Sequence, residues 1–326
     1  MTKLALHYDL RHPAQFPASA VDIYGAALDQ IAWGETRGFT QVSFGEHHQA
    51  TDGYNPCPLL FAAAIGGRTS TIRVRINAVI APLYHPIRLA EEIAVADLLL
   101  QGRLEVSVAA GYMPDDFEMF GQPYRGRGRR LEEIVAILRL AWTGEPFEFE
   151  GKTVRVTPRP YQDPMPIHMG GNADVAIERA ARVADGFHAA RFEDYERYRA
   201  ACATVGRTVP PPLPPQGPIF LWITDDVDRA WDWLEPHVRH QVDTYAAWSA
   251  AAFGKPDAGA FVPKDGVDIR RSNDAYRVMT PTEAINLAHD LGEDGVLHFS
   301  PLLAGIDPAR SWEMLERFET AVLPHI

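Results

Sequence analysis

The feature that most restricts the fold of this chain is the regular alternation of short apolar runs with longer helical patterns. The runs are apolar along most of their length rather than at every second position, as expected for strands buried on both faces. Strands of this kind separated by helices are typical of parallel βαβ units. Eight can be counted: KLALHY (3–8), QVSF (41–44), IRVRINAVI (72–80), LEVSVAA (104–110), PIHMG (166–170), GFHAA (186–190), IFLWIT (219–224) and GVLHFS (295–300). Eight such units in succession predict an α/β fold, a (β/α)8 TIM barrel, with an open doubly wound sheet as the alternative.

The segments between the runs carry the marks of amphipathic helices. PIRLAEEIAVADLLLQGR begins with proline, aligns Leu89, Ile93, Ala96 and Leu100 on one face, and stops at Gly102. RRLEEIVAILRLAWTG repeats the pattern. ADVAIERAARVADG and DVDRAWDWLEPHV are shorter versions. These helices are predicted to pack on the outside of the strands.

Two insertions interrupt the alternation. Residues 145–165, after the fourth strand, are predicted to form an excursion with its own strand pair. Residues 254–279, between the seventh and eighth strands, match no regular element. An irregular stretch of that length in a compact barrel is typical of a binding loop, so we expect it to close the pocket. The whole chain, 1–326, is predicted to be a single barrel domain.

Composition excludes several classes of protein. The two cysteines, Cys57 and Cys202, are too few for a disulfide framework and lack zinc-site spacing, which indicates reduced thiols in the cytoplasm. The first residues, MTKLALHYDL, show no signal-peptide pattern, and no window approaches the apolar length of a membrane span. A formal net charge of −12 repels nucleic acid backbones. We therefore expect neither a membrane nor a nucleic acid as partner.

In a barrel, function lies at the carboxyl ends of the strands, and the second strand ends in Glu46, His47 and His48. Neighbouring side chains on a strand point to opposite faces, so the two histidines are not expected to share one role. Three interpretations stay open: a metal site, a pair of structural histidines, or one imidazole that transfers protons or orients a substrate beside a structural neighbour. The pair lacks helical spacing and a third ligand for a metal, and no metal site is predicted.

The fifth strand is followed by Gly170, Gly171 and Asn172 at the start of a helical pattern. Backbone N–H groups at a helix N-terminus bind anions, and glycine lets a phosphate approach closely. Arginines in YRGRGRR (124–130) could balance the charge. A simple strand-to-helix turn and a solvated basic face explain these residues equally well.

Several motifs together resemble the bacterial-luciferase-like family of flavin-dependent oxidoreductases. They are EHH after the second strand, APLYHPIRLAEEIAVADLLLQGRLEVSVAAGY (81–112), and DDFEMFG (115–121) before the arginine-rich helix start. The resemblance is dense over 40–140, looser over 160–190, and fades afterwards. It implies a TIM-like barrel that binds reduced FMN, or in one branch 8-hydroxy-5-deazaflavin, at its mouth, and a homodimer.

The resemblance also implies roles for individual residues. His47 matches the histidine linked to catalysis, and a non-proline cis peptide that supports the flavin maps onto Ala78–Val79. Phosphate contacts map onto Gly170, Gly171 and Arg127. Luciferases carry an arginine where this chain has Ala110, a departure that puts flavin affinity in doubt. The cofactor-binding residues expected are Asn77, Ala78, Val79, Ala110, Gly111, Tyr112, Arg127, Gly170, Gly171 and Asn172.

The resulting hypothesis is a two-component flavin monooxygenase that uses reduced FMN, supplied transiently by a separate flavin reductase, and molecular oxygen to oxidise a small apolar organic substrate. The alternatives are a deazaflavin-dependent oxidoreductase that transfers hydride and a non-catalytic flavin-binding subunit. The sequence does not reveal the substrate. Aromatic residues near the seventh strand suggest an apolar cavity, although ordinary core explains them too: Trp222, Trp231, Trp233, Tyr245, Trp248 and Phe253.

Overall fold

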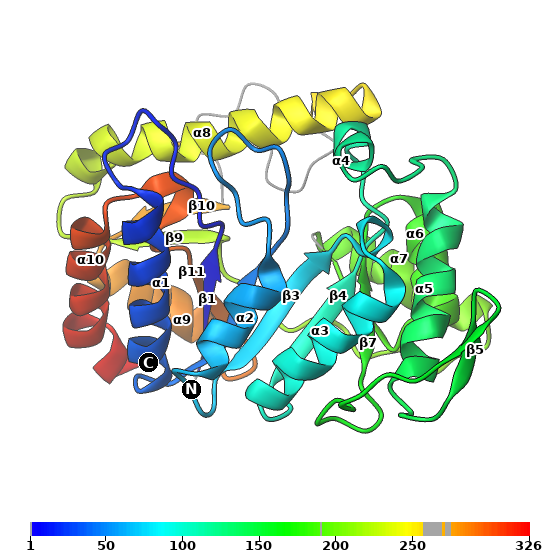
Figure 1. The fold of residues 1–326 in the computed structure, drawn as a ribbon. Coiled ribbons are helices and arrows are strands. Elements are labelled where there is room, and N and C mark those ends of the chain that lie inside the picture. The colour runs from blue at the N-terminus through cyan, green and yellow to red at the C-terminus, as the bar shows by residue number, and fades with distance from the viewer. Residues whose placement is uncertain (1, 190, 257–268, 271–274) are drawn as a thin grey trace. The chain divides into compact units, whose positions relative to one another are not determined.

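The computed structural model describes residues 2–189, 191–256, 269–270 and 275–326 and divides the chain into two compact α/β units (Figure 1). The first unit comprises Met1–Ser43, His47–Pro56 and Pro214–Ile326. The second comprises Phe44–Glu46 and Cys57–Leu213. None of the helices described is long and apolar enough to cross a membrane.

The first unit contains two groups of strands. β1 (Lys3–Tyr8) lies between β11 (Val296–Phe299) and β2 (Phe39–Phe44), and it runs parallel to β11 with Lys3 opposite Val296. β9 (Phe220–Ile223) pairs in parallel with β10 (Tyr276–Met279). Helices α1 (Ala20–Glu35) and α10 (Pro308–Ala321) lie side by side (Figure 1). The other helices are α8 (Val227–Phe253), α9 (Pro281–Leu291) and the 3-10 turns η3 (Leu303–Gly305) and η4 (Leu323–His325).

Local signals in the sequence account for the helix boundaries of this unit. Ser19 caps α1 through a reciprocal capping box with Asp22, and Thr280 caps α9 in the same way with Glu283. Each box satisfies backbone N–H groups that the first turn leaves without partners. The helices cover a core in which the buried rings of Phe39, Phe299 and Phe318 meet at 4.7–5.7 Å between centroids. Burying one such ring contributes about 1.5–3 kcal/mol.

The second unit is built on four strands in the order β3-β4-β7-β8, each parallel to its neighbour. Their bounds are Arg73–Val79, Leu104–Val108, Ile167–Gly170 and Gly186–His188. Five helices follow one another around them, each in contact with the next (Figure 1): α2 (Pro58–Gly66), α3 (Pro86–Leu99), α5 (Arg127–Ala141), α6 (Asp174–Val183) and α7 (Phe192–Thr204). Short elements complete the unit: η1 (Ala81–Leu83), α4 (Pro114–Met119), and the antiparallel pair β5 (Phe147–Phe149) and β6 (Lys152–Val154).

Each of the eight predicted runs contains a strand, and the strand pair predicted within 145–165 is present as β5 and β6. The interpretation of 254–279 as wholly irregular was wrong, because Tyr276–Met279 forms β10 against β9. The short run YRVM follows a polar stretch, which hid the strand. Residues 257–268 and 271–274 of that segment lie outside the described residues. A single barrel domain over 1–326 stays a prediction.

Candidate active site

The carboxyl end of β3 carries a cis peptide bond between Asn77 and Ala78. The cis peptide was expected between Ala78 and Val79, and this prediction was wrong by one peptide bond. Val79 is fully buried and accepts a backbone hydrogen bond from Ala109 at 2.9 Å, so it belongs to the regular sheet. The irregularity precedes it, where the register with β4 shifts between Ile76 and Val79. The exposed Asn77 and partly buried Ala78 can therefore face a ligand, whereas the side chain of Val79 cannot.

Gly170 lies beside this peptide at the end of β7. A Cβ atom added to Gly170 would lie 3.2 Å from Asn77 Oδ1 and 3.8 Å from Ala78 Cβ. The ends of β3 and β7 thus lie close together, with the side chains of Asn77 and Ala78 next to a position that has none. The structure brings these three predicted residues together.

A second group of predicted residues gathers where β4 ends. Arg127, the first residue of α5, donates from Nε to the carbonyl of Gly111 at 2.9 Å. Its guanidinium lies 3.9 Å from the ring centroid of Tyr124, whose hydroxyl donates to the carbonyl of Tyr112 at 3.1 Å. Ala110, in the same turn, is partly buried. These partners of Arg127 are neutral, so its positive charge is not cancelled by them.

The turn from β7 into α6 requires glycine. Gly171 has a φ of +145°, and a Cβ atom there would lie 2.8 Å from Ala176 Cβ. Ala173 caps α6 without a side-chain hydrogen bond. The carbonyl of Asn172 accepts from Arg197 Nη1 at 3.0 Å, and Arg197 also pairs with Asp174. The turn thus combines a helix N-terminus with a nearby arginine, as an anion site does.

Glu46 binds the chain that follows β3. Its carboxylate accepts from the backbone N–H of Ile80 at 2.8 Å and from the Tyr84 hydroxyl at 2.9 Å. Burial, assisted by the Glu46 charge, raises the pKa of Tyr84, which therefore stays a neutral donor. Glu46 fixes the chain immediately after the cis peptide.

His47 belongs to the first unit and lies among aromatic rings. Its imidazole stacks on Trp248 with 4.2 Å between centroids and meets the edge of Tyr54 at 4.7 Å. Burial, followed by the charges of Arg11 and His48, lowers the pKa of His47 to about 3. The imidazole is therefore neutral near pH 7. In the described part of the chain, no group of three or more His, Cys, Asp or Glu side chains could hold a metal ion.

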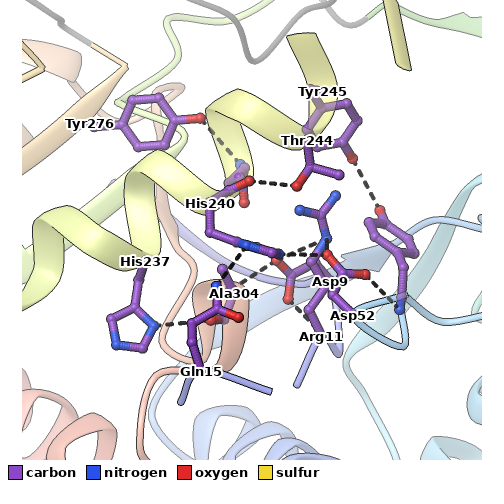
Figure 2. A network of polar contacts seen from close by, with 12 residues as sticks. Asp9, Arg11, Gln15, Asp52, His237, His240, Thr244, Tyr245, Tyr276 and Ala304 are labelled. Carbon is purple, nitrogen blue, oxygen red and sulfur yellow. Dashed lines mark hydrogen bonds and ion pairs between the residues drawn. The ribbon is translucent and has the colours of Figure 1, made fainter. Parts of the chain in front are cut away.

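The sequence interpretation missed the charged residues beside this histidine. Asp9 and Arg11 follow β1 directly, and Asp52 lies in the loop after the histidine pair; all three are buried (Figure 2). The signal that could have found them is the appearance of two charges at the carboxyl end of the first strand, where the barrel rule already directs attention.

The family model for luciferase-like monooxygenases matches residues 8–285. The chain belongs to this family. One solved structure with a similar fold is that of the oxygenating constituent of 3,6-diketocamphane monooxygenase from Pseudomonas putida in complex with FMN. That structure is similar with a TM-score of 0.74 and 20% identity, and the match covers 100% of this chain and 99% of the other. At this identity the likeness shows the fold.

Two curated relatives carry different cofactors in their names. The oxygenase component of flavin-dependent trigonelline monooxygenase from Acinetobacter baylyi is 28% identical over 151 residues, 44% of this chain and 42% of the relative. The F420-dependent glucose-6-phosphate dehydrogenase from Nakamurella multipartita is 32% identical over 185 residues, 53% of this chain and 54% of the relative. The chain spans about half the length of the curated relatives it matches. The family therefore contains both FMN-dependent and F420-dependent oxidoreductases.

Proposed function

We propose that this protein is a flavin-dependent monooxygenase that uses reduced FMN and molecular oxygen to oxidise a small apolar organic substrate. The observation that carries the proposal is the meeting of Asn77, Ala78 and Gly170 at the ends of two strands. A planar ring could approach the backbone of Gly170 closely because this residue contributes no side chain. One oxygen atom would enter the substrate and the other would leave as water, with the electrons supplied by reduced FMN.

The residues of the second unit suit an anionic, planar cofactor. Asn77 and Ala78 would contact the ring, and Gly111 and Tyr112 would form its surroundings. Gly170, Gly171 and Asn172 would present backbone to the phosphate at the start of α6. Arg127 would supply the positive charge that Ala110 does not. Because several of the phosphate contacts would come from backbone donors, we expect the cofactor to bind transiently rather than tightly.

His47 is proposed as the catalytic residue of the first unit. Because its pKa is lowered to about 3, it acts as a neutral imidazole that donates or accepts a hydrogen bond at the substrate. Its stacking on Trp248 fixes the plane of the ring. The surrounding aromatic side chains would exclude water from the reacting groups.

A transient flavin reductase partner and a homodimer are parts of the same proposal. The trigonelline relative is named as an oxygenase component, which supports a separate supplier of reduced flavin. The second candidate is an F420-dependent oxidoreductase that transfers hydride without oxygen. The dehydrogenase relative and the alanine at position 110 favour it.

Titration with each cofactor tests the proposal. We expect anaerobic fluorescence titration to show saturable binding of reduced FMN, about tenfold weaker in Arg127→Met because one charge-assisted contact is lost. Arg129→Met is the matched control, since Arg129 is exposed and pairs only with Glu133 on its own helix among the contacts described. Supplied with a flavin reductase, the protein should consume oxygen in step with substrate oxidation, and His47→Ala should abolish the oxidation.

Two results would overturn the monooxygenase assignment. Binding of reduced F420 without binding of reduced FMN would establish the hydride-transfer alternative. A preparation that is strongly yellow because it retains oxidised FMN would contradict the two-component scheme.

A further inference from the structure

Arg11 is surrounded by aromatic rings within the first unit. Its side chain has no exposed surface. The guanidinium carbon lies 4.9 Å from the ring centroid of Tyr54, 5.1 Å from Tyr245 and 5.0 Å from Trp248. His47 stacks on the same Trp248. We call these four aromatic side chains with Arg11 the Arg11 cage.

The donors of Arg11 are not used by the described part of the chain. Neither Nε nor Nη1 nor Nη2 has a hydrogen-bond partner there. The buried Arg103 of the second unit differs in its two terminal nitrogens, which donate to Ile72 O at 2.7 Å and to Thr69 O at 2.8 Å, although its Nε has no hydrogen-bond partner among the described residues. Buried polar groups without partners are rare and costly, and each calls for an explanation such as a ligand or a water molecule. Among the described residues no acceptor makes a hydrogen bond with the Arg11 guanidinium, so its donors could serve an acceptor oxygen from a ligand.

The charge of Arg11, in contrast to its hydrogen bonds, is balanced. Nε lies 3.4 Å from Asp52 Oδ2 and 3.9 Å from Asp9 Oδ2 (Figure 2). Burial opposes ionisation of Asp52, but the hydrogen bond from His240 and the charge of Arg11 give it a lowered pKa. Burial raises the pKa of Asp9. The carboxyl groups of Asp52 and Asp9 lie 3.4 and 3.9 Å from Nε, so an anionic ligand would enter a buried site that already holds two acidic side chains.

These observations specify the ligand. It needs an acceptor oxygen for the guanidinium fork, no charge of its own, and a flat apolar body that fits between aromatic rings. Tyr245 and Trp248, both on α8, are only partly buried, so these two walls of the cage extend to the protein surface.

We propose that the Arg11 cage binds an uncharged, planar organic molecule through its carbonyl oxygen, with Arg11 as the donor. That this molecule is the substrate rests on the proposed function, because the neutral imidazole of His47 is part of the same cage. Arg11 is then the residue that selects carbonyl compounds over both carboxylates and hydrocarbons.

Three probes of similar size separate the possibilities: acetophenone, benzoate and ethylbenzene. Their binding to the full chain, without added flavin, is measured by ligand-observed NMR with competition. We expect acetophenone to bind at least about tenfold more tightly than the other two, because only it supplies a neutral acceptor. Omitting the flavin keeps the result independent of the cofactor titration, so that either proposal can fail alone.

Variants separate recognition from structural support. Arg11→Lys keeps the charge between Asp9 and Asp52 but loses the planar fork, and should reduce the preference for acetophenone over ethylbenzene about tenfold. Trp248→Leu removes one wall of the cage and should weaken the binding of acetophenone and of ethylbenzene by similar factors. This variant tests the binding site independently if Arg11→Lys does not fold. Trp33→Phe, at a ring that contacts Phe39 and Trp312, is the control and should change neither.

Three outcomes would overturn the proposal. Tighter binding of benzoate than of acetophenone would identify an anion site. Equal binding of acetophenone and ethylbenzene would make Arg11 a structural residue. Absence of saturable binding by all three probes would show that the cage takes no such ligand.

Discussion

At the scale of single residues, glycine does most to shape the candidate flavin site. Gly111 has a φ of +74°, and a Cβ atom there would lie 2.6 Å from Ile80 Cγ2 and 3.0 Å from Phe117 Cε2. Its carbonyl is the acceptor for Arg127. The turn after β4 therefore depends on the absence of a side chain both for its backbone conformation and for its packing.

A pair of alanine substitutions separates these two effects. Gly121 also has a left-handed φ, +62°, but a Cβ atom there would meet nothing within 4 Å. Gly121→Ala should cost only the backbone penalty, about 1–2 kcal/mol. Gly111→Ala should cost a further 1–3 kcal/mol, roughly, from overpacking, and should weaken FMN binding. Urea unfolding of both variants measures the difference, and equal losses would show that the contact with Ile80 is not restrictive.

The residues of the site differ in how well sequence could identify them. Gly170, Gly171 and His47 could be proposed from sequence because they occur at the carboxyl ends of strands within recognisable motifs, and their roles stay predictions. Arg11 was missed because its significance depends on Asp52, Tyr245 and Trp248, which are distant in the chain and meet only through tertiary packing. The cis peptide was placed one bond too late because a local shift in register does not alter the sequence pattern.

At the scale of elements, strands and helix starts were predictable because hydrophobic runs and caps are local. β10 was not, since a run of only four residues, Tyr276–Met279, carries little periodic signal. α8 was predicted too short: it continues past Pro236 for a total of 27 residues. Proline usually ends a helix, and here tertiary packing of Val238, Gln241 and Val242 overrides that preference.

The four strands of the second unit share a polar layer that sequence did not reveal. Glu105 on β4 accepts from Arg73 Nε at 2.6 Å and from Arg75 Nε at 2.8 Å, both on β3. Burial opposes ionisation of Glu105, but the two arginines give it a lowered pKa. His188 on β8 lies within hydrogen-bond distance of Ser107 on β4 and stacks on His168 of β7. The layer links all four strands by side chains as well as by backbone.

Removing the central carboxylate should weaken this unit. Glu105→Gln removes the carboxylate that both arginines contact, and we expect the free energy of unfolding to fall by about 1–3 kcal/mol, because partial exposure of the arginines reduces the penalty of a buried pair. Glu92→Gln is the control: Glu92 pairs with Arg88 on the surface of α3 at 2.8 Å, where about 0.5 kcal/mol is expected. Thermal unfolding compares the two. A loss from Glu105→Gln no greater than that of the control would mean that the layer contributes little.

At the scale of the whole molecule, the stability of the protein should depend on histidines in both units. Burial is the first cause that lowers the pKa of each of three imidazoles from the ordinary 6.5: to about 4 for His7, about 3 for His47 and about 2 for His188. Folded, these rings stay neutral at pH values where the unfolded chain binds protons. Their contribution to stability is therefore complete above pH 6.5 and is lost as the pH falls from there toward the folded-state values.

The free energy of unfolding should accordingly fall between about pH 6.5 and pH 4.5, before most carboxylates titrate. Each such histidine adds a slope of up to about 1.4 kcal/mol per pH unit. Urea unfolding at a series of pH values measures the sum. A variant carrying both His7→Gln and His188→Asn should lose the contributions of these two residues, whatever its stability at pH 7, because the slope reports protons and not packing. An unchanged slope in that variant would mean that His7 and His188 already accept protons in the folded protein, and the surroundings of both rings would then be more open to water than their burial indicates.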